Sequence, residues 1–98
     1  MPALSNRVVS IYNRKTSVRF APAEWEAIEH ICHQENIPRK ILFELIDLNH
    51  DEKMSFASAI RLFLVIYYKN AVSNINTPQK HNKDEFFSPI FEAIKGII

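Results

Sequence analysis

The sequence predicts a mainly α-helical domain with a short β-ribbon, and three observations lead to this prediction. Residues 15–20 alternate between polar and apolar side chains with the period of a strand. Three later segments repeat apolar residues at helical spacing. The last of these, residues 56–69, is apolar on nearly every side, and 47% of the 98 residues are hydrophobic. A single domain this small is therefore expected to share its core with a second copy.

The alternating strand has one face suited to packing and one suited to polar contacts. The apolar face holds Thr16, Val18 and Phe20, and the polar face holds Lys15, Ser17 and Arg19. Residues 7–12 are β-prone but do not alternate cleanly, so they are expected to form an arm or a short strand. We therefore expect residues 1–13 to be an N-terminal arm and the main domain to span residues 14–69.

Two helices joined by a tight turn are expected to follow the strand. The first should run from Pro22, which suits a first helical turn, to Glu35, and Asn36 suits the left-handed residue that ends a helix. The second should begin at Pro38. The apolar positions of the two helices are Trp25, Ile28, Ile31, Cys32, Ile41, Leu42, Leu45 and Ile46.

A third helix should begin after Ser55, a suitable N-cap, and cover residues 56–69. Because it is apolar on nearly every side, it should be buried on every side, most simply in the centre of a dimer. Residues 70–83 are expected to be a linker, and residues 84–98 an apolar C-terminal helix with Ser88 and Pro89 at its start. That helix must dock on its own domain, on the other subunit or on a separate protein.

Charge is distributed unevenly although the formal net charge is only +1. Residues 1–20 contain Arg7, Arg14, Lys15 and Arg19 and no acidic residue, whereas residues 21–35 contain several glutamates and no lysine or arginine. A near-neutral total can therefore hide the basic arm of a nucleic-acid-binding protein.

Metal, cofactor and catalytic sites are not expected. Residues 47–58 have polar side chains at the alternate positions that hold ligands in a calcium-binding loop. However, Glu52 replaces the required glycine and Ser58 replaces the bidentate glutamate. His30, Cys32 and His33 form one cluster, whereas zinc sites usually combine two. The sequence has a single glycine and no nucleophile or phosphate-loop motif. We expect no metal, no cofactor and no enzymatic activity.

The expected location is the cytoplasm. One cysteine cannot form an internal disulfide, and no apolar run long enough for a signal peptide precedes the polar residues 5–7. The longest apolar stretch, residues 60–68, is far shorter than the roughly 20 residues of a membrane span.

The chain resembles the ribbon-helix-helix DNA-binding proteins over about residues 7–69. The segments "RKTSVRFAPAEWEAIEHI", "RKILFELID" and "SFASAIRLFLVIYYK" resemble a bacterial subfamily with a Thr-Ser-Val strand and a Ser-x-x-x-Ala-Ile-Arg-Leu-Phe helix. The resemblance implies an intertwined homodimer in which two copies of the strand pair as an antiparallel ribbon and enter the DNA major groove. The strand of residues 15–20 would then find its partner in a second molecule.

The resemblance also implies a role for each candidate residue. The base-reading side chains would be Lys15, Ser17 and Arg19, and the phosphate contacts would come from Arg7, Arg14, Arg39 and Lys40. The dimer core would contain Thr16, Val18, Phe20, Trp25, Ile28, Leu42, Ile46 and Phe63. The family also binds phosphate at the start of its second helix, where Pro38 here replaces the usual hydroxyl residue.

The expected function is a sequence-specific transcriptional regulator, a repressor that binds double-stranded DNA as a homodimer, with further dimers alongside if the chain follows its relatives. The main alternative is an antitoxin-type protein whose residues 84–98 capture a partner protein. A weaker alternative is an adaptor of the same fold that has lost DNA binding, which the near-neutral charge keeps open.

Overall fold

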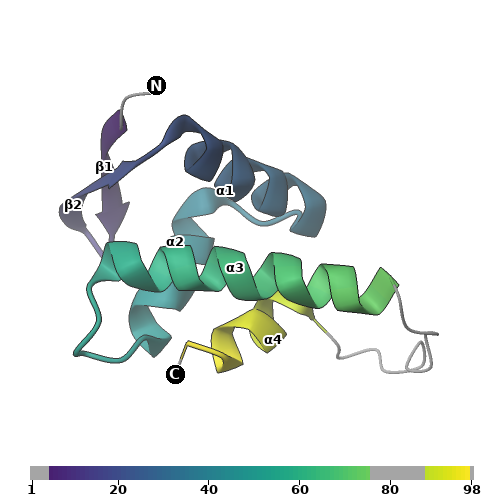
Figure 1. Cartoon of the computed structure of the whole chain (residues 1–98). Coiled ribbons are helices and arrows are strands. Elements are labelled where there is room, and N and C mark those ends of the chain that lie inside the picture. The colour runs from purple at the N-terminus through teal and green to yellow at the C-terminus, as the bar shows by residue number, and fades with distance from the viewer. Residues whose placement is uncertain (1–4, 76–87, 98) are drawn as a thin grey trace.

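The computed structural model describes residues 5–75 and 88–97 and consists of a two-stranded hairpin followed by four helices (Figure 1). The elements are β1 (Ser5–Ile11), β2 (Arg14–Phe20), α1 (Pro22–Glu35), α2 (Arg39–Asn49), α3 (Phe56–Ile75) and α4 (Pro89–Lys95). Figure 1 shows α3 crossing the whole domain, with the hairpin near the beginning of α3 and α4 packed against it. The order of a ribbon followed by helices is the one that the sequence predicts.

The strand β2 pairs with β1 of its own chain. The two strands are antiparallel, with Ser5 opposite Phe20 at one end and Ile11 opposite Arg14 at the other. Tyr12 and Asn13 connect them with φ values of 49° and 65°, the left-handed pair that a tight two-residue hairpin turn requires. Of the two expectations for this segment, an arm or a short strand, the structure shows a strand over Ser5–Ile11. From the sequence, β2 was expected to pair with the same strand of a second molecule. In the structure its neighbour is instead β1 of the same chain.

The helices α1 and α2 begin and end close to the predicted positions. Pro22 starts α1, and Asn36 ends it in the left-handed conformation, with φ 56° and ψ 51°. Pro38 lies at the N-cap of α2 rather than inside its first turn, so α2 begins one residue later than predicted.

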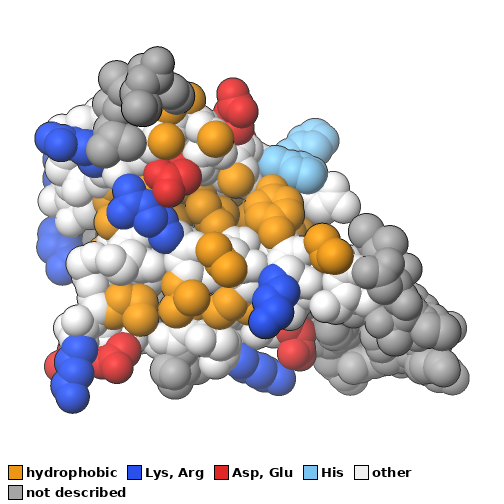
Figure 2. Space-filling view, in the orientation of Figure 1, with side chains coloured by type: hydrophobic (Ala, Val, Ile, Leu, Met, Phe, Trp, Pro, Cys, Tyr) orange, Lys and Arg blue, Asp and Glu red, His pale blue; other side chains and the backbone are white. Residues whose placement is uncertain are grey.

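The helix α3 begins as predicted and ends later. The Ser55 Oγ atom accepts a hydrogen bond of 3.1 Å from the Ser58 amide, which confirms the N-cap. The helix continues to Ile75, so residues 70–75 are helical and are not the start of a linker, and residues 76–83 of the predicted linker lie outside the described residues. Val65 and Val72 are 61% and 57% exposed, so one chain does not bury α3 on every side. Figure 2 shows apolar side chains across the middle of the view, where Figure 1 places α3.

The C-terminal helix α4 docks on its own chain. It packs against α3 and α2, and the Ser88 Oγ atom accepts the Phe91 amide at its start. Its buried residues, with Ile97 just after it, are Ile90, Ala93 and Ile94. The sequence left open whether this helix docks on its own domain, on the other subunit or on a separate protein, and the structure shows it on its own domain. Phe86, Phe87 and Ile98 of the predicted apolar tail lie outside the described residues.

This docking can be measured with a conservative substitution. Ile94 is 4% exposed, and Ile94→Val is expected to lower the free energy of unfolding by about 0.5–1.5 kcal/mol because a buried methyl group is lost. The matched control is Ile41→Val, at a position 41% exposed, which should change it by less than about 0.5 kcal/mol. Urea denaturation compares the two variants, and equal effects would show that α4 is not held against the domain.

The core lies between the inner face of the hairpin and the helices. Phe20 and Phe63 are fully buried, and the Trp25 ring meets the Phe20 ring edge-on with 5.1 Å between centroids. The other predicted core residues Val18, Ile28, Leu42 and Ile46 are also buried, and Thr16 is half-buried. All of them are covered within one chain, so their place in a dimer core remains a prediction. No helix of the described residues is long and apolar enough to span a membrane.

Candidate nucleic-acid interface

The outward face of the hairpin gathers side chains from both strands. On β2 these are the predicted residues Lys15, Ser17 and Arg19, and all three are exposed. Directly opposite them on β1 lie Ser10, Val8 and Asn6, in that order, and these are exposed too. The sequence predicted the β2 half of this face and missed the β1 half.

The outward face has the chemistry of a base-reading surface. Lys15 and Arg19 are basic, Asn6, Ser10 and Ser17 can donate and accept hydrogen bonds, and no acidic residue occurs in the hairpin. Val8 is an apolar side chain that is 66% exposed in the middle of this face. These are the side-chain types that contact guanine, adenine and the thymine methyl group in the major groove.

Arg61 of α3 anchors the end of β2 that carries Arg19. Its Nη2 atom donates to the Arg19 carbonyl oxygen at 3.0 Å, and its Nε atom lies 2.9 Å from Glu24 Oε2. The guanidinium also lies 4.9 Å from the centroid of the Phe20 ring. The arginine of the "AIRLF" segment therefore fixes the backbone at a predicted base-reading residue, a role that the sequence did not reveal.

Glu24 completes this anchor, and its pKa is shifted. Partial burial raises the pKa of the carboxyl group, but hydrogen bonds from Arg61 and from the Ala21 amide, together with the charge of Arg61, outweigh burial and leave the pKa below its ordinary value of 4.5. The Ala21 amide donates to Glu24 Oε1 at 2.8 Å, which also caps the first turn of α1.

The anchor should make stability depend on pH in the acid range. The pKa of Glu24 is lower in the folded state than in the unfolded state. Its contribution to the free energy of unfolding is therefore complete at pH values above the unfolded-state pKa, near 4.5, and is lost as the pH falls through the lower folded-state pKa. Glu24→Gln should therefore flatten the decline in the urea midpoint between about pH 5 and pH 3. Glu52→Gln, at an exposed loop position, is the control and should leave the decline as in the wild type.

Glu44 holds the other end of the hairpin. Its Oε2 atom accepts the Tyr12 amide at 3.0 Å, and its carbonyl oxygen accepts the Tyr12 hydroxyl at 3.4 Å. Lys40 lies 3.1 Å from the same carboxylate. The Tyr12 hydrogen bond, and after it the one from Lys40, lower the pKa of Glu44. The turn is thus tied to α2 by a residue that no sequence motif marked.

Three of the four predicted phosphate-binding residues form ion pairs at the surface. Arg14 lies 3.6 Å from Asp47 and Arg39 lies 3.0 Å from Glu29, in addition to the Lys40 pair with Glu44. All three cations are exposed, and surface ion pairs contribute only about 0–1 kcal/mol, so exchanging the carboxylate for a DNA phosphate would cost little for Arg14 and Arg39. The partner of Lys40 is less accessible, because the Glu44 side chain is only 12% exposed.

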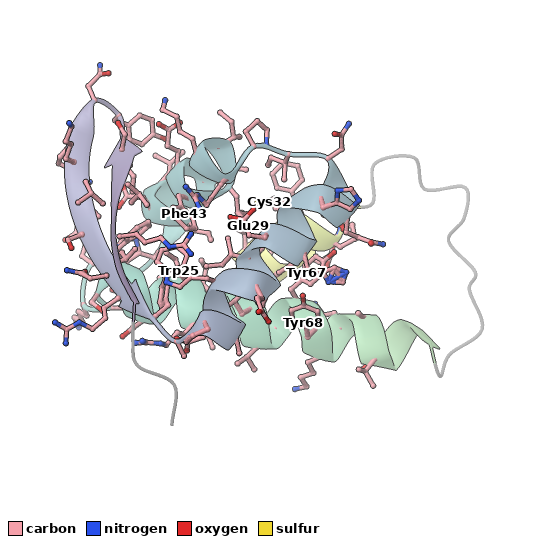
Figure 3. All side chains as sticks on the ribbon, turned by 90° about the horizontal axis from the view of Figure 1, so that it is seen from above. Trp25, Glu29, Cys32, Phe43, Tyr67 and Tyr68 are labelled. Atoms are coloured by element: carbon pink, nitrogen blue, oxygen red, sulfur yellow. The ribbon has the colours of Figure 1, made fainter. Side chains whose placement is uncertain are left out.

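Arg7, the fourth, does not belong to the outward face. It lies on the inner side of β1, opposite Val18, with its guanidinium 4.3 Å from the centroid of the Trp25 ring. Figure 3 shows Trp25 directed from α1 toward the hairpin. The structure therefore separates Arg7 from the base-reading candidates.

The start of α2 lies beside β1. A cavity of about 210 Å³ is lined there by Val8, Val9, Ser10, Arg39, Lys40 and Phe43. Because Pro38 is the N-cap, the amides of residues 39–41 keep their N–H groups, which have no acceptor inside the helix. Pro38 therefore does not remove a donor from the first turn, although no side chain caps it.

The metal-site candidates gain no support from the described residues, which contain no group of three or more His, Cys, Asp or Glu placed to hold a metal. Cys32 is buried, and burial raises the pKa of its thiol. This fits the core position that its spacing in α1 indicates.

Comparison with known families identifies the fold. Residues 4–68 match the family model described as the ribbon-helix-helix domain, and the chain belongs to this family. Members are generally DNA-binding regulators or antitoxins. No curated protein and no solved structure gave a significant match.

Proposed function

We propose that the protein is a sequence-specific DNA-binding transcriptional regulator that represses by occupying an operator. The reading element is the outward face of the β-ribbon, which lies in the major groove with Lys15, Ser17 and Arg19 directed at base edges. Such a regulator would act in the bacterial cytoplasm, on the nucleoid.

The observation that carries the proposal is the composition of one exposed surface. The outward face bears basic and neutral polar side chains and no carboxylate, while the opposite face of the same strands is seated in the core through Val18 and Phe20. In Figure 2, Lys and Arg side chains mark the edge of the molecule where Figure 1 places the hairpin. A β-ribbon with this charge, tied to the helices at both ends, suits the major groove.

We further propose that the protein acts as a homodimer. In the described chain β2 has a neighbour on only one side, so its other edge can accept a strand. Pairing with β2 of a second copy, as the family resemblance implied, would join the two outward faces into one surface. The exposed apolar residues Val65 and Val72 on α3 offer a second contact for that copy.

Phosphate contacts would flank this surface. Arg14 lies at the turn end of β2, and Arg39 and Lys40 lie in the first turn of α2, whose amides and helix dipole favour an anion. Each such contact would add about one unit to the slope of log affinity against log salt concentration.

Selection of bound duplexes from a random pool tests the function. The full-length chain should enrich one short motif, and a duplex carrying that motif should be bound at least about a thousand times more tightly than a scrambled duplex at physiological salt. Equal binding to both duplexes would contradict a sequence-specific regulator.

The antitoxin-type alternative depends on a C-terminal helix that is free to capture a partner. Since α4 buries Ile90, Ala93 and Ile94 within its own chain, Phe91 is the one large apolar side chain of the described tail that is exposed for a partner. Deleting residues 78–98 is accordingly expected to destabilise the domain rather than to release a co-purifying protein.

A further inference from the structure

The hairpin pairing brings β1 side chains beside the residues to which the proposed function assigns base reading. Asn6 lies directly opposite Arg19 in the register, and its Oδ1 atom accepts a hydrogen bond of 2.8 Å from the Ser17 hydroxyl. We propose that Asn6 reads a base as part of the same surface, and that it specifies an adenine next to the guanine contacted by Arg19. This inference rests on the proposed function.

The first argument is distance. Side chains directly opposite each other in an antiparallel pair have Cβ atoms about 4.5–5.5 Å apart. Successive base pairs are about 3.4 Å apart along the duplex. Asn6 and Arg19 are therefore spaced similarly to neighbouring base pairs, and because both lie in one chain this spacing does not depend on a second copy.

The second argument is chemistry. An asparagine amide can bind adenine bidentately by accepting from N6 and donating to N7. The Asn6 carbonyl oxygen has two lone pairs, of which the Ser17 hydroxyl uses one, so it retains an acceptor site beside two amide N–H donors. The Ser17 bond restrains the rotation of the amide, so Ser17 acts as a positioning residue for Asn6 in addition to any base contact of its own.

The third argument is that Asn6 takes no part in the packing of the core and bonds only across the exposed face, to Ser17, among the hydrogen bonds of the described residues. Its side chain is exposed, and the inner face of the same strand supplies the packing through Val9 and Ile11. Removing the amide is therefore expected to leave the fold intact, which makes the assignment testable.

The experiment compares binding motifs selected by full-length variants from one random duplex pool. Asn6→Ala should lose discrimination for adenine at one base pair by roughly 5- to 150-fold, with the remaining positions of the motif unchanged. Asn6→Asp keeps the acceptor for Ser17 but loses the amide donors, so the preferred base at that position should change from adenine to cytosine, whose N4 donates to a carboxylate. Gln34→Ala removes an exposed amide from α1 and should return the wild-type motif.

The outcomes separate this inference from the proposed function. If both Asn6 variants select the wild-type motif while Arg19→Ala selects an altered one, the role of Asn6 is overturned and the proposed function stands. A wild-type protein that enriches no motif would overturn both. Circular dichroism spectra that match the wild type establish that each variant is folded.

Discussion

Phe20→Ala is expected to lower the free energy of unfolding by about 3–5 kcal/mol. The side chain is fully buried at the end of β2, against the edge of the Trp25 ring and under the Arg61 guanidinium. Its removal leaves a cavity where the hairpin meets α1 and α3. Because small domains have only about 5–15 kcal/mol of stability in total, this loss takes a large share.

Phe91→Ala is the matched control for this prediction. Phe91 is 54% exposed on α4, so the same chemical change there should alter stability by less than about 0.5 kcal/mol. Urea denaturation followed by far-ultraviolet circular dichroism reports both variants without depending on the environment of Trp25. A small effect of Phe20→Ala would mean that the inner face of the hairpin is not seated on the helices as described.

Arg19→Ala is expected to cost about 1–3 kcal/mol of discrimination at one base pair while it relaxes the sequence preference. An arginine can bind the O6 and N7 atoms of guanine together, and alanine offers neither donor. The backbone of residue 19 should stay in place because Arg61 holds its carbonyl oxygen and not its side chain. Gel-shift titrations on an operator duplex and a scrambled duplex give the two affinities.

Arg39→Ala separates base reading from phosphate binding. It should weaken binding to both duplexes about equally and reduce the salt slope by about one, since a phosphate contact carries no sequence information. Equal loss on both duplexes for Arg19→Ala would instead place Arg19 on the backbone and count against direct readout.

The sequence predicted the helices and the inner face of β2 because their signals are local. Pro22 and Asn36 mark the ends of α1 by their backbone preferences, and the period of two in β2 correctly divided Val18 and Phe20 from Lys15, Ser17 and Arg19. Burial followed from that alternation without knowledge of the partner strand. The roles of the exposed side chains stay predictions.

The partner of β2 was harder to predict. The strongest hairpin signal is an Asn-Gly or Asp-Gly turn, and here Tyr12 and Asn13 adopt the same left-handed conformations without a glycine. In β1 the exposed Val8 interrupts the alternation, so the strand did not look amphipathic. The outward position of Asn6 follows only from the register, which periodicity within one strand does not contain.

Long-range polar contacts were also beyond the sequence. Arg61 and Glu24 are far apart in the chain, and Glu44 meets Tyr12 across 32 residues. The charge pattern placed these residues on surfaces but gave no reason to pair them. The end of α3 was missed because residues 70–83 as a whole are polar, rich in asparagine and contain Pro78, although the helix continues to Ile75.

The central claim is that the outward face of the hairpin reads DNA, and one selection experiment tests it most directly. The wild type and the variant Lys15→Ala/Ser17→Ala/Arg19→Ala are each used to select duplexes from a random pool. The control Lys69→Ala/Lys95→Ala removes the same number of positive charges from exposed sites on α3 and α4. The wild type and the control are predicted to enrich the same motif, and the triple variant to enrich none; a triple variant that recovers the wild-type motif would contradict the account.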